Sequence, residues 1–224
     1  MGKIVSTIAV LVLALVSFSL SYEEIKRAYE KSYLYERLGD YKNAIRVLMP
    51  VYEAYPEGYT VNLRLGWLYY LWGKYKNSEF HYRKAVKAVP SSAEAKLGLS
   101  LPLSAQQKWN EVESLMYRVL AVDYYNYYGN LRLCQALREQ KKYDLMMAVA
   151  KKMLALYPTS VPFLVYLAEG YYLTGKKEEA ENLFRDVLIL DPENVTAKKY
   201  LRLLEEEGEK ETEEGSKGEP SDQS

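Results

Sequence analysis

Apolar residues recur at helical spacing through most of the chain, in paired stretches of about 14 residues with short polar segments between them. When the chain is slid against itself by 34 residues, these pairs align without gaps. The units span 25–58, 59–92, 93–126, 127–160 and 161–194, and a sixth unit begins at Val195. Repetition at a fixed period of this length predicts stacked structural units.

Three columns of the alignment indicate how each unit is built. A turn column, where a helix ends in a left-handed conformation that suits Gly, holds Gly39, Gly73, Gln107, Lys141 and Gly175. A column of small residues, which lets helices approach closely, holds Ser32, Gly66, Ser100, Cys134 and Ala168. The closing column, where Pro stops a second helix, holds Pro56, Pro90, Tyr124, Pro158 and Pro192.

One helical pair cannot bury its apolar face alone, whereas several stacked pairs can. The pattern therefore predicts an all-α protein, an α-solenoid over residues 22–206 that ends in a capping helix at 195–206. Two prolines fall inside predicted helices. Pro50 should bend the second helix of repeat one, and Pro102 should kink the first helix of repeat three.

These columns resemble the tetratricopeptide repeat, in its 34-residue length, its small eighth residue, the aromatic residue after the turn and the final Pro. Ala44, Ala180, Phe184, Asp191 and Pro192 also match its pattern. The resemblance covers roughly residues 25–206. It implies a right-handed superhelix of antiparallel helix pairs, with a protein or peptide partner held in the concave groove.

The resemblance also implies which residues line this groove, namely those on the exposed side of each first helix. The candidate partner-binding residues are Tyr29, Tyr33, Arg64, Trp67, Tyr70, Leu101, Arg132, Gln135, Arg138, Tyr166, Glu169 and Tyr172. Tyr, Trp and Arg dominate binding energy at interfaces. The alternative is that some of these aromatic residues pack between neighbouring repeats. In repeat three the groove offers small side chains at Gly98 and Ser104, which predicts a notch in the groove. The residues expected to flank it are Trp67 and Tyr70, which should face the open groove, and Arg132 and Arg138.

The first 21 residues differ from the rest. Lys3 precedes an apolar run over residues 4–20, and Ser19 and Ser21 provide small residues at a cleavage-like site. The layout favours a cleaved signal peptide, with a membrane tether through residues 4–20 or a buried helix as the alternatives. Signal or anchor, the repeats would lie outside the cytoplasm, in the periplasm or secreted.

Formal charge is zero overall but unevenly spread. Residues 205–224 hold nine acidic and two basic residues, which leaves 28 basic and 21 acidic residues before them. The segment 207–224 is predicted to be a disordered acidic tail. Nucleic-acid binding is disfavoured, because the basic residues are scattered and the chain carries an export-like segment.

The sequence contains few residues that could act in catalysis or bind a metal. His81 is the single histidine and Cys134 the single cysteine, too few for a zinc site, and no glycine-rich phosphate loop is present. We expect both residues to be structural, and we expect no enzyme activity, no cofactor and no metal. The leading interpretation is an adaptor of the cell envelope, and the alternative is a self-assembling envelope scaffold. The oligomeric state is left open.

Overall fold

The computed structural model describes residues 20–217, and this part of the chain is helical with no strand. The predicted all-α solenoid is confirmed. Its helices are α1 (Tyr22–Arg37), α2 (Tyr41–Arg46), α3 (Met49–Ala54), α4 (Tyr59–Leu71), α5 (Tyr75–Ala88), α6 (Ala93–Ala105), α7 (Trp109–Leu120), α8 (Tyr127–Glu139), α9 (Tyr143–Leu154), α10 (Val161–Leu173), α11 (Lys177–Leu190) and α12 (Val195–Lys217).

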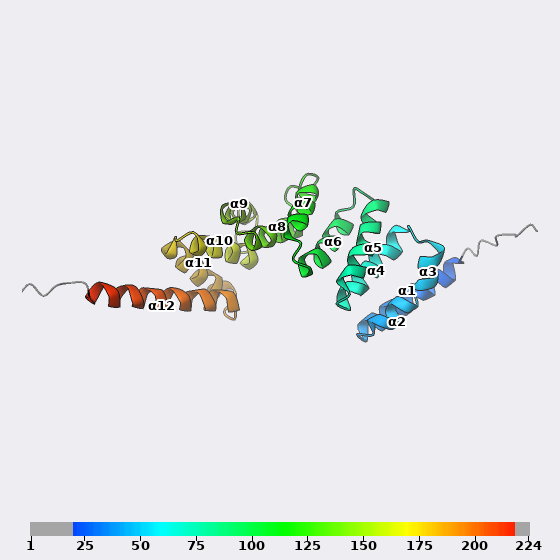
Figure 1. Cartoon of the computed structure of the whole chain (residues 1–224), viewed down its shortest axis with the longest axis horizontal. Coiled ribbons are helices and arrows are strands. Elements are labelled where there is room, and N and C mark those ends of the chain that lie inside the picture. Colours follow the sequence, from blue (N-terminus) through cyan, green and yellow to red (C-terminus); the bar gives the residue numbers. More distant parts are fainter. Residues whose placement is uncertain (1–19, 218–224) are drawn as a thin grey trace, which may run out of the picture.

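The helices form an elongated array in which each pair stacks on the next, from α1 at one end to α12 at the other (Figure 1). The first helices of repeats two to five begin at the first residue of their units. Each of them packs against the second helix of its own unit and against the first helix of the next. Among the described residues the core accordingly follows the array as three successive clusters of buried side chains.

The turn column adopts the left-handed conformation in all five units. The φ angles are 71° at Gly39, 72° at Gly73, 81° at Gly175, 57° at Gln107 and 59° at Lys141. The last two are not glycine, and a left-handed conformation costs a residue with a Cβ roughly 1–2 kcal/mol. Repeats three and four therefore keep the register of the array at a local cost.

The column of small residues is buried throughout. Ser32, Ser100, Cys134 and Ala168 expose no surface, and Gly66 is buried as well. A Cβ on Gly66 would lie 2.8 Å from the Tyr82 ring, closer than side chains tolerate. Small side chains at this position thus let neighbouring helices approach, as the sequence predicts.

The two prolines have different outcomes. In repeat one the second helix is divided into α2 and α3, and Pro50 occupies the first turn of α3, where its missing N–H costs least. In repeat three, α6 continues through Pro102 to Ala105 without a break. Pro102 is buried and its carbonyl accepts a hydrogen bond from Gln106 Nε2 at 2.9 Å.

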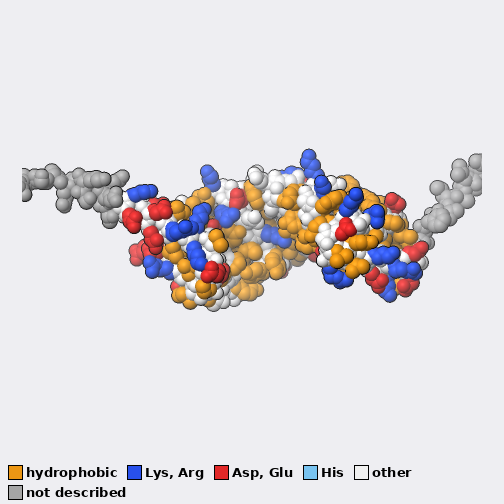
Figure 2. Space-filling model, turned by 90° about the horizontal axis from the view of Figure 1, so that it is seen from below, with side chains coloured by type: hydrophobic (Ala, Val, Ile, Leu, Met, Phe, Trp, Pro, Cys, Tyr) orange, Lys and Arg blue, Asp and Glu red, His pale blue; other side chains and the backbone are white. Residues whose placement is uncertain are grey.

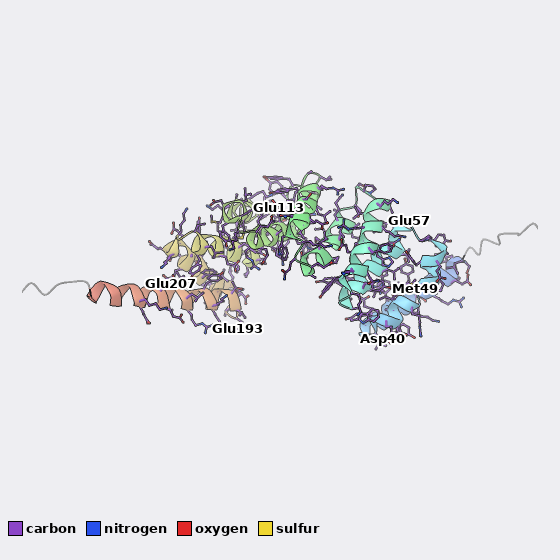
Figure 3. The ribbon with its side chains drawn as sticks, in the orientation of Figure 1. Asp40, Met49, Glu57, Glu113, Glu193 and Glu207 are labelled. Atoms are coloured by element: carbon purple, nitrogen blue, oxygen red, sulfur yellow. The ribbon has the colours of Figure 1, made fainter. Side chains whose placement is uncertain are left out.

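The C-terminal helix is longer than expected, because α12 continues to Lys217 where the sequence predicted disorder from residue 207. Glu207 accepts a hydrogen bond from the Tyr172 hydroxyl at 2.5 Å and pairs with Lys177 at 3.0 Å, on the stretch of α12 below α10 and α11 (Figure 3). These contacts hold the polar segment against the last repeat, and its Glu and Lys residues are good helix formers. The last seven positions of the predicted tail lie outside the described residues.

Ser21 begins the folded array as the N-cap of α1. Its hydroxyl accepts a hydrogen bond from the Glu24 N–H at 3.3 Å, and the Glu24 carboxylate accepts one from the Ser21 N–H at 2.8 Å. The predicted signal or anchor segment lies almost wholly outside the described residues. Within residues 20–217, no helix is long and apolar enough to cross a membrane.

Replacing Gln107 or Lys141 by Gly should raise the free energy of unfolding by about 1 kcal/mol, because Gly adopts the left-handed conformation without strain. Denaturation in urea followed by circular dichroism measures the change. Gly39→Ala is the control, and it should lower the free energy of unfolding. No atom lies within 4 Å of the added Cβ, so this loss measures the strain of the left-handed backbone without a steric clash. A lower free energy of unfolding in both Gln107→Gly and Lys141→Gly would contradict the prediction.

Candidate functional site

A hollow of ≈ 380 Å³ lies among the first helices of repeats one, two and three. It is lined by Tyr29, Tyr33, Thr60, Leu63, Arg64, Trp67, Tyr82, Glu94, Gly98 and Leu101. Five of these were predicted as groove residues, and they come from three different helices. Tyr29, Tyr33, Arg64, Trp67 and Leu101 therefore share one concavity, whereas Tyr70, also predicted in repeat two, is not among its lining residues.

Tyr82 forms part of the wall, although it comes from α5, a second helix. Its side chain is only 3% exposed, and its ring occupies the space left by two glycines of the first helices. A Cβ on Gly98 would lie 2.2 Å from Tyr82 Cε1. Burial raises the pKa of the Tyr82 hydroxyl, so the phenol stays protonated.

Arg64 is buried beside the hollow and joins repeat two to repeat one. Its side chain is 7% exposed, Nη1 lies 2.5 Å from Glu36 Oε2, and Nη2 donates to Ser32 Oγ at 3.2 Å. The guanidinium carbon lies 3.8 Å from the centre of the Tyr33 ring, a cation–π contact. Arg64 Nε is buried and has no hydrogen-bond partner among the described residues.

Trp67 is tied to the same carboxylate. Its Nε1 donates to Glu36 Oε1 at 2.7 Å, and its ring stacks on Tyr70 with centroids 5.9 Å apart. The half-buried side chain packs against the core and also lines the hollow, so Trp67 combines the predicted groove position with the alternative of packing between repeats. The Glu36 carboxylate on α1 therefore binds two side chains of α4, Arg64 and Trp67, and holds these two walls of the hollow together.

The rim of the hollow is polar. The Tyr59 hydroxyl lies 2.9 Å from Ser92 Oγ and donates to Glu94 Oε2 at 2.9 Å, which places Glu94 at the edge opposite α1. Burial raises the pKa of Tyr29 to about 12. The hollow thus combines protonated phenols, apolar side chains and one acidic group at its mouth.

The notch predicted in repeat three is located differently. Gly98 does leave space, but Tyr82 fills part of it, and the concavity lies between α1, α4 and α6 instead of between repeats two and four. The reason is that a side chain from a second helix can reach through a glycine pair, which a pattern of first-helix positions does not reveal. The paired glycines, Gly66 and Gly98, are the signal that could have found Tyr82.

Arg132 does not flank this hollow. It occupies the same place in repeat four as Arg64 does in repeat two, and it donates to the Leu97 carbonyl and to Ser100 Oγ. Burial lowers its pKa. Its nitrogens are therefore used between repeats, and its part in partner binding stays a prediction.

The remaining candidates lie farther along the array. Arg138 lies 3.4 Å from Glu169 and 2.8 Å from Glu139, and its guanidinium is 5.8 Å from the Tyr166 ring centre. Glu169 is 4% exposed, and burial raises its pKa although Arg138 opposes the shift. Gln135 and Tyr172 are half-buried. Arg138, Glu139, Glu169 and Tyr166 thus form a polar cluster outside the first hollow. The binding role of all these candidates stays a prediction.

The two residues considered for chemistry are both buried. Burial lowers the pKa of His81 to about 4, and its Nδ1 lies 2.9 Å from Asn62 Oδ1. Burial raises the pKa of the Cys134 thiol to about 12. Both groups are therefore uncharged near neutral pH, and no group of three metal-ligating residues occurs within the described part of the chain.

Comparison with known proteins agrees with this geometry. Residues 29–93 match the tetratricopeptide repeat family profile. A tetratricopeptide repeat protein from Parabacteroides merdae ATCC 43184 superposes with a TM-score of 0.75, at 16% identity over 81% of this chain and 72% of that chain. The chain has the fold of a tetratricopeptide-repeat protein. MamA superposes with a TM-score of 0.68, at 19% identity over 76% of this chain and 93% of its own.

One sequence relative is the uncharacterized protein ycf37 of Cyanophora paradoxa, 36% identical over 73 residues. The match spans 33% of this chain and 41% of that protein. The shared segment is about as long as two of the 34-residue units.

Replacing Glu36 by Ala should lower the free energy of unfolding by about 3–5 kcal/mol, because Arg64 would stay buried without its counter-charge. Replacing both residues with apolar ones, Glu36→Leu with Arg64→Met, should restore most of the loss. Chemical denaturation measures each variant.

The matched control is Glu57→Ala, which removes a 61% exposed carboxylate from its pair with Lys84 at 2.8 Å. Exposed pairs contribute about 0–1 kcal/mol, so this variant should remain close to the parent. Equal effects of Glu36→Ala and Glu57→Ala would show that the buried pair does not hold repeats one and two together.

Proposed function

We propose that this chain is a non-enzymatic adaptor that holds an extended segment of a partner protein in the hollow between α1, α4 and α6. The observation that carries the proposal is the aromatic concavity that three successive first helices share, lined by five of the residues predicted for the groove. Tyr, Trp and Arg side chains supply much of the binding energy at protein interfaces.

The chemistry of the hollow favours a particular kind of segment. Glu36 already neutralises Arg64, so the hollow favours no acidic group of a partner. Tyr33, Leu63 and Leu101 offer contact to an apolar or aromatic side chain of the partner. The proposed partner is a peptide segment with an apolar anchor residue, and its charge is secondary.

Self-assembly remains the second candidate because α1 has an uncovered outer face. Leu34 on this terminal helix is 48% exposed, and its C-cap residue Leu38 is 70% exposed. The opposite end is covered, since Ala197 and Leu204 of α12 pack into the core of the last repeat. The view from below shows acidic and basic side chains together at both ends and hydrophobic ones along most of the array (Figure 2). The hydrophobic side chains along the array support binding there, and the uncovered face of α1 keeps stacking through the ends as the alternative.

We also propose that the adaptor works outside the cytoplasm, exported or anchored by its apolar N-terminal segment. The cap formed by Ser21 supports cleavage before Leu20 over cleavage before Tyr22, because the later cut would remove a cap that stabilises a helix by about 1 kcal/mol.

Replacing Tyr33 by Ala should weaken peptide binding by about 1–2 kcal/mol and change stability little, because the ring is 49% exposed at the hollow. The test selects binding peptides from a displayed random library with the full chain and measures their affinity by calorimetry. Leu101→Ser should weaken the same peptides.

The matched control is Tyr125→Ala, a tyrosine with 48% exposure in the loop before α8, which should leave affinity unchanged. Leu133→Ala, at a residue 1% exposed, should cost about 2–5 kcal/mol of stability and marks the effect of a lost core side chain. If Tyr125→Ala and Tyr33→Ala weaken binding equally, the hollow is not the site.

For location, mass spectrometry of the chain purified from fractionated cells should show a first residue at Leu20, or intact Met1 in the membrane fraction. The expected difference follows from cleavage or retention of the apolar run over residues 4–20. Recovery of the intact chain in a soluble cytoplasmic fraction would contradict both forms of the proposal.

A further inference from the structure

One charged side chain at the hollow between α1, α4 and α6 lacks a counter-charge. The charged residues that line this hollow are Arg64 and Glu94. Glu36 lies 2.5 Å from Arg64 and neutralises it. Glu94 is exposed, and no Lys or Arg of the described residues forms an ion pair with it. The hollow therefore carries one uncompensated negative charge.

The Glu94 carboxylate is held in place by a neutral group. The Tyr59 hydroxyl donates to Glu94 Oε2 at 2.9 Å and lies 2.9 Å from Ser92 Oγ. Burial and the Glu94 carboxylate raise the pKa of Tyr59, so the phenol keeps its proton. The hydrogen bond fixes one carboxylate oxygen without removing its charge. The other oxygen, Oε1, has no hydrogen-bond donor in the described part of the chain and is open to a cation.

Repeat four shows that this carboxylate is not needed to join neighbouring units. The hydroxyl of Tyr127 lies 2.9 Å from Ser160 Oγ, in the same arrangement as Tyr59 and its serine. The residue that corresponds to Glu94 at this second junction is Pro162, which has no charge. The contact between tyrosine and serine therefore forms without an acidic group, and the carboxylate is an addition found at the concave hollow.

The charge and the apolar surface of the hollow are separated along one helix. Glu94, Gly98 and Leu101 all line the hollow from α6, and their spacing places them on one face of that helix. The seven residues from Glu94 to Leu101 rise about 10 Å along the helix axis. An extended peptide advances about 3.3–3.6 Å per residue, so the same distance corresponds to about three residues of a bound segment.

We propose that the partner segment carries a Lys or Arg about three residues from its apolar anchor, and that this basic side chain pairs with Glu94. The inference rests on the proposed peptide binding and specifies which segments the hollow selects. The cation binds the carboxylate oxygen that Tyr59 leaves open, while the anchor contacts Tyr33, Leu63 and Leu101. The net charge of the segment stays secondary, because Glu94 recognises one basic group at one distance from the anchor.

The experiment selects peptides from a displayed random library with the full chain and with its Glu94→Gln variant, and sequences both bound pools. The parent pool should be enriched in Lys and Arg at about two to four positions from a bulky apolar residue. The Glu94→Gln pool should keep the apolar residue and lose the basic one. Glu94 is exposed, so the variant should keep the unfolding midpoint of the parent.

Two further variants test the charge and its place. Glu94→Lys should select Asp or Glu at the distance where the parent selects a basic residue, because the sign of the charge is reversed. Glu178→Gln is the matched control. Glu178 is an exposed carboxylate in the first turn of α11, as Glu94 is in the first turn of α6, but it does not line the hollow. This control should select the same peptides as the parent.

Calorimetry with one lysine-containing peptide from the parent pool measures the size of the effect. Replacing its lysine by norleucine removes the charge and keeps an aliphatic side chain. This change should weaken binding to the parent about two- to fivefold, as expected for an exposed ion pair. It should leave binding to Glu94→Gln unchanged, and the effect on the parent should shrink at high salt.

Different results would overturn the inference and the proposed function. A parent pool enriched in apolar residues without Lys or Arg at that distance would overturn the inference and leave peptide binding in the hollow standing. Equal basic enrichment with the parent and with Glu94→Gln would also overturn it, because another group would then bind the cation. Peptides whose affinity is unaffected by Tyr33→Ala would show that the hollow is not the site, which overturns the proposed function and the inference together.

Discussion

The close approach of successive first helices across a buried small residue is the constraint on which the other contacts depend. It brings the neighbouring backbone within reach of side chains on the concave side. Arg64 reaches Ser32 and Arg132 reaches Ser100, so the residues that set the helix spacing also accept bonds that fix the groove wall. The same small residues therefore set the helix spacing and accept the polar contact between repeats, once at Ser32 and once at Ser100.

The repeat pattern was enough to predict the fold, because its signals are local. A left-handed turn, a small contact residue and a stop for the second helix can each be read from one position and its neighbours. The continuation of α12 past residue 206 was missed because the contact at Glu207, with Tyr172, joins residues 35 positions apart. The site was predicted only in part for the same reason. Nothing near Trp67 in the sequence indicates that its indole bonds to Glu36.

Repeats two and four have the same asparagine but differ in the residues around it. Both keep an asparagine that ties the loop before its helix, yet only one keeps the aromatic cluster that completes it. A polar group retained after its partner has been replaced is informative, because burial makes it costly unless something else pairs with it. Comparison of repeats within one chain provides this contrast without any second protein.

The division of the second helix in repeat one into α2 and α3 has a consequence for the whole array. The terminal unit has two short helices where the others have one long one, and terminal units of a repeat array open first, since each has a neighbour on one side only. One wall of the concave hollow belongs to this unit and the opposite wall to α6, two units inward. A ligand bound to both walls would resist the opening of the terminal unit. Binding in the groove would therefore make the first three units unfold more cooperatively.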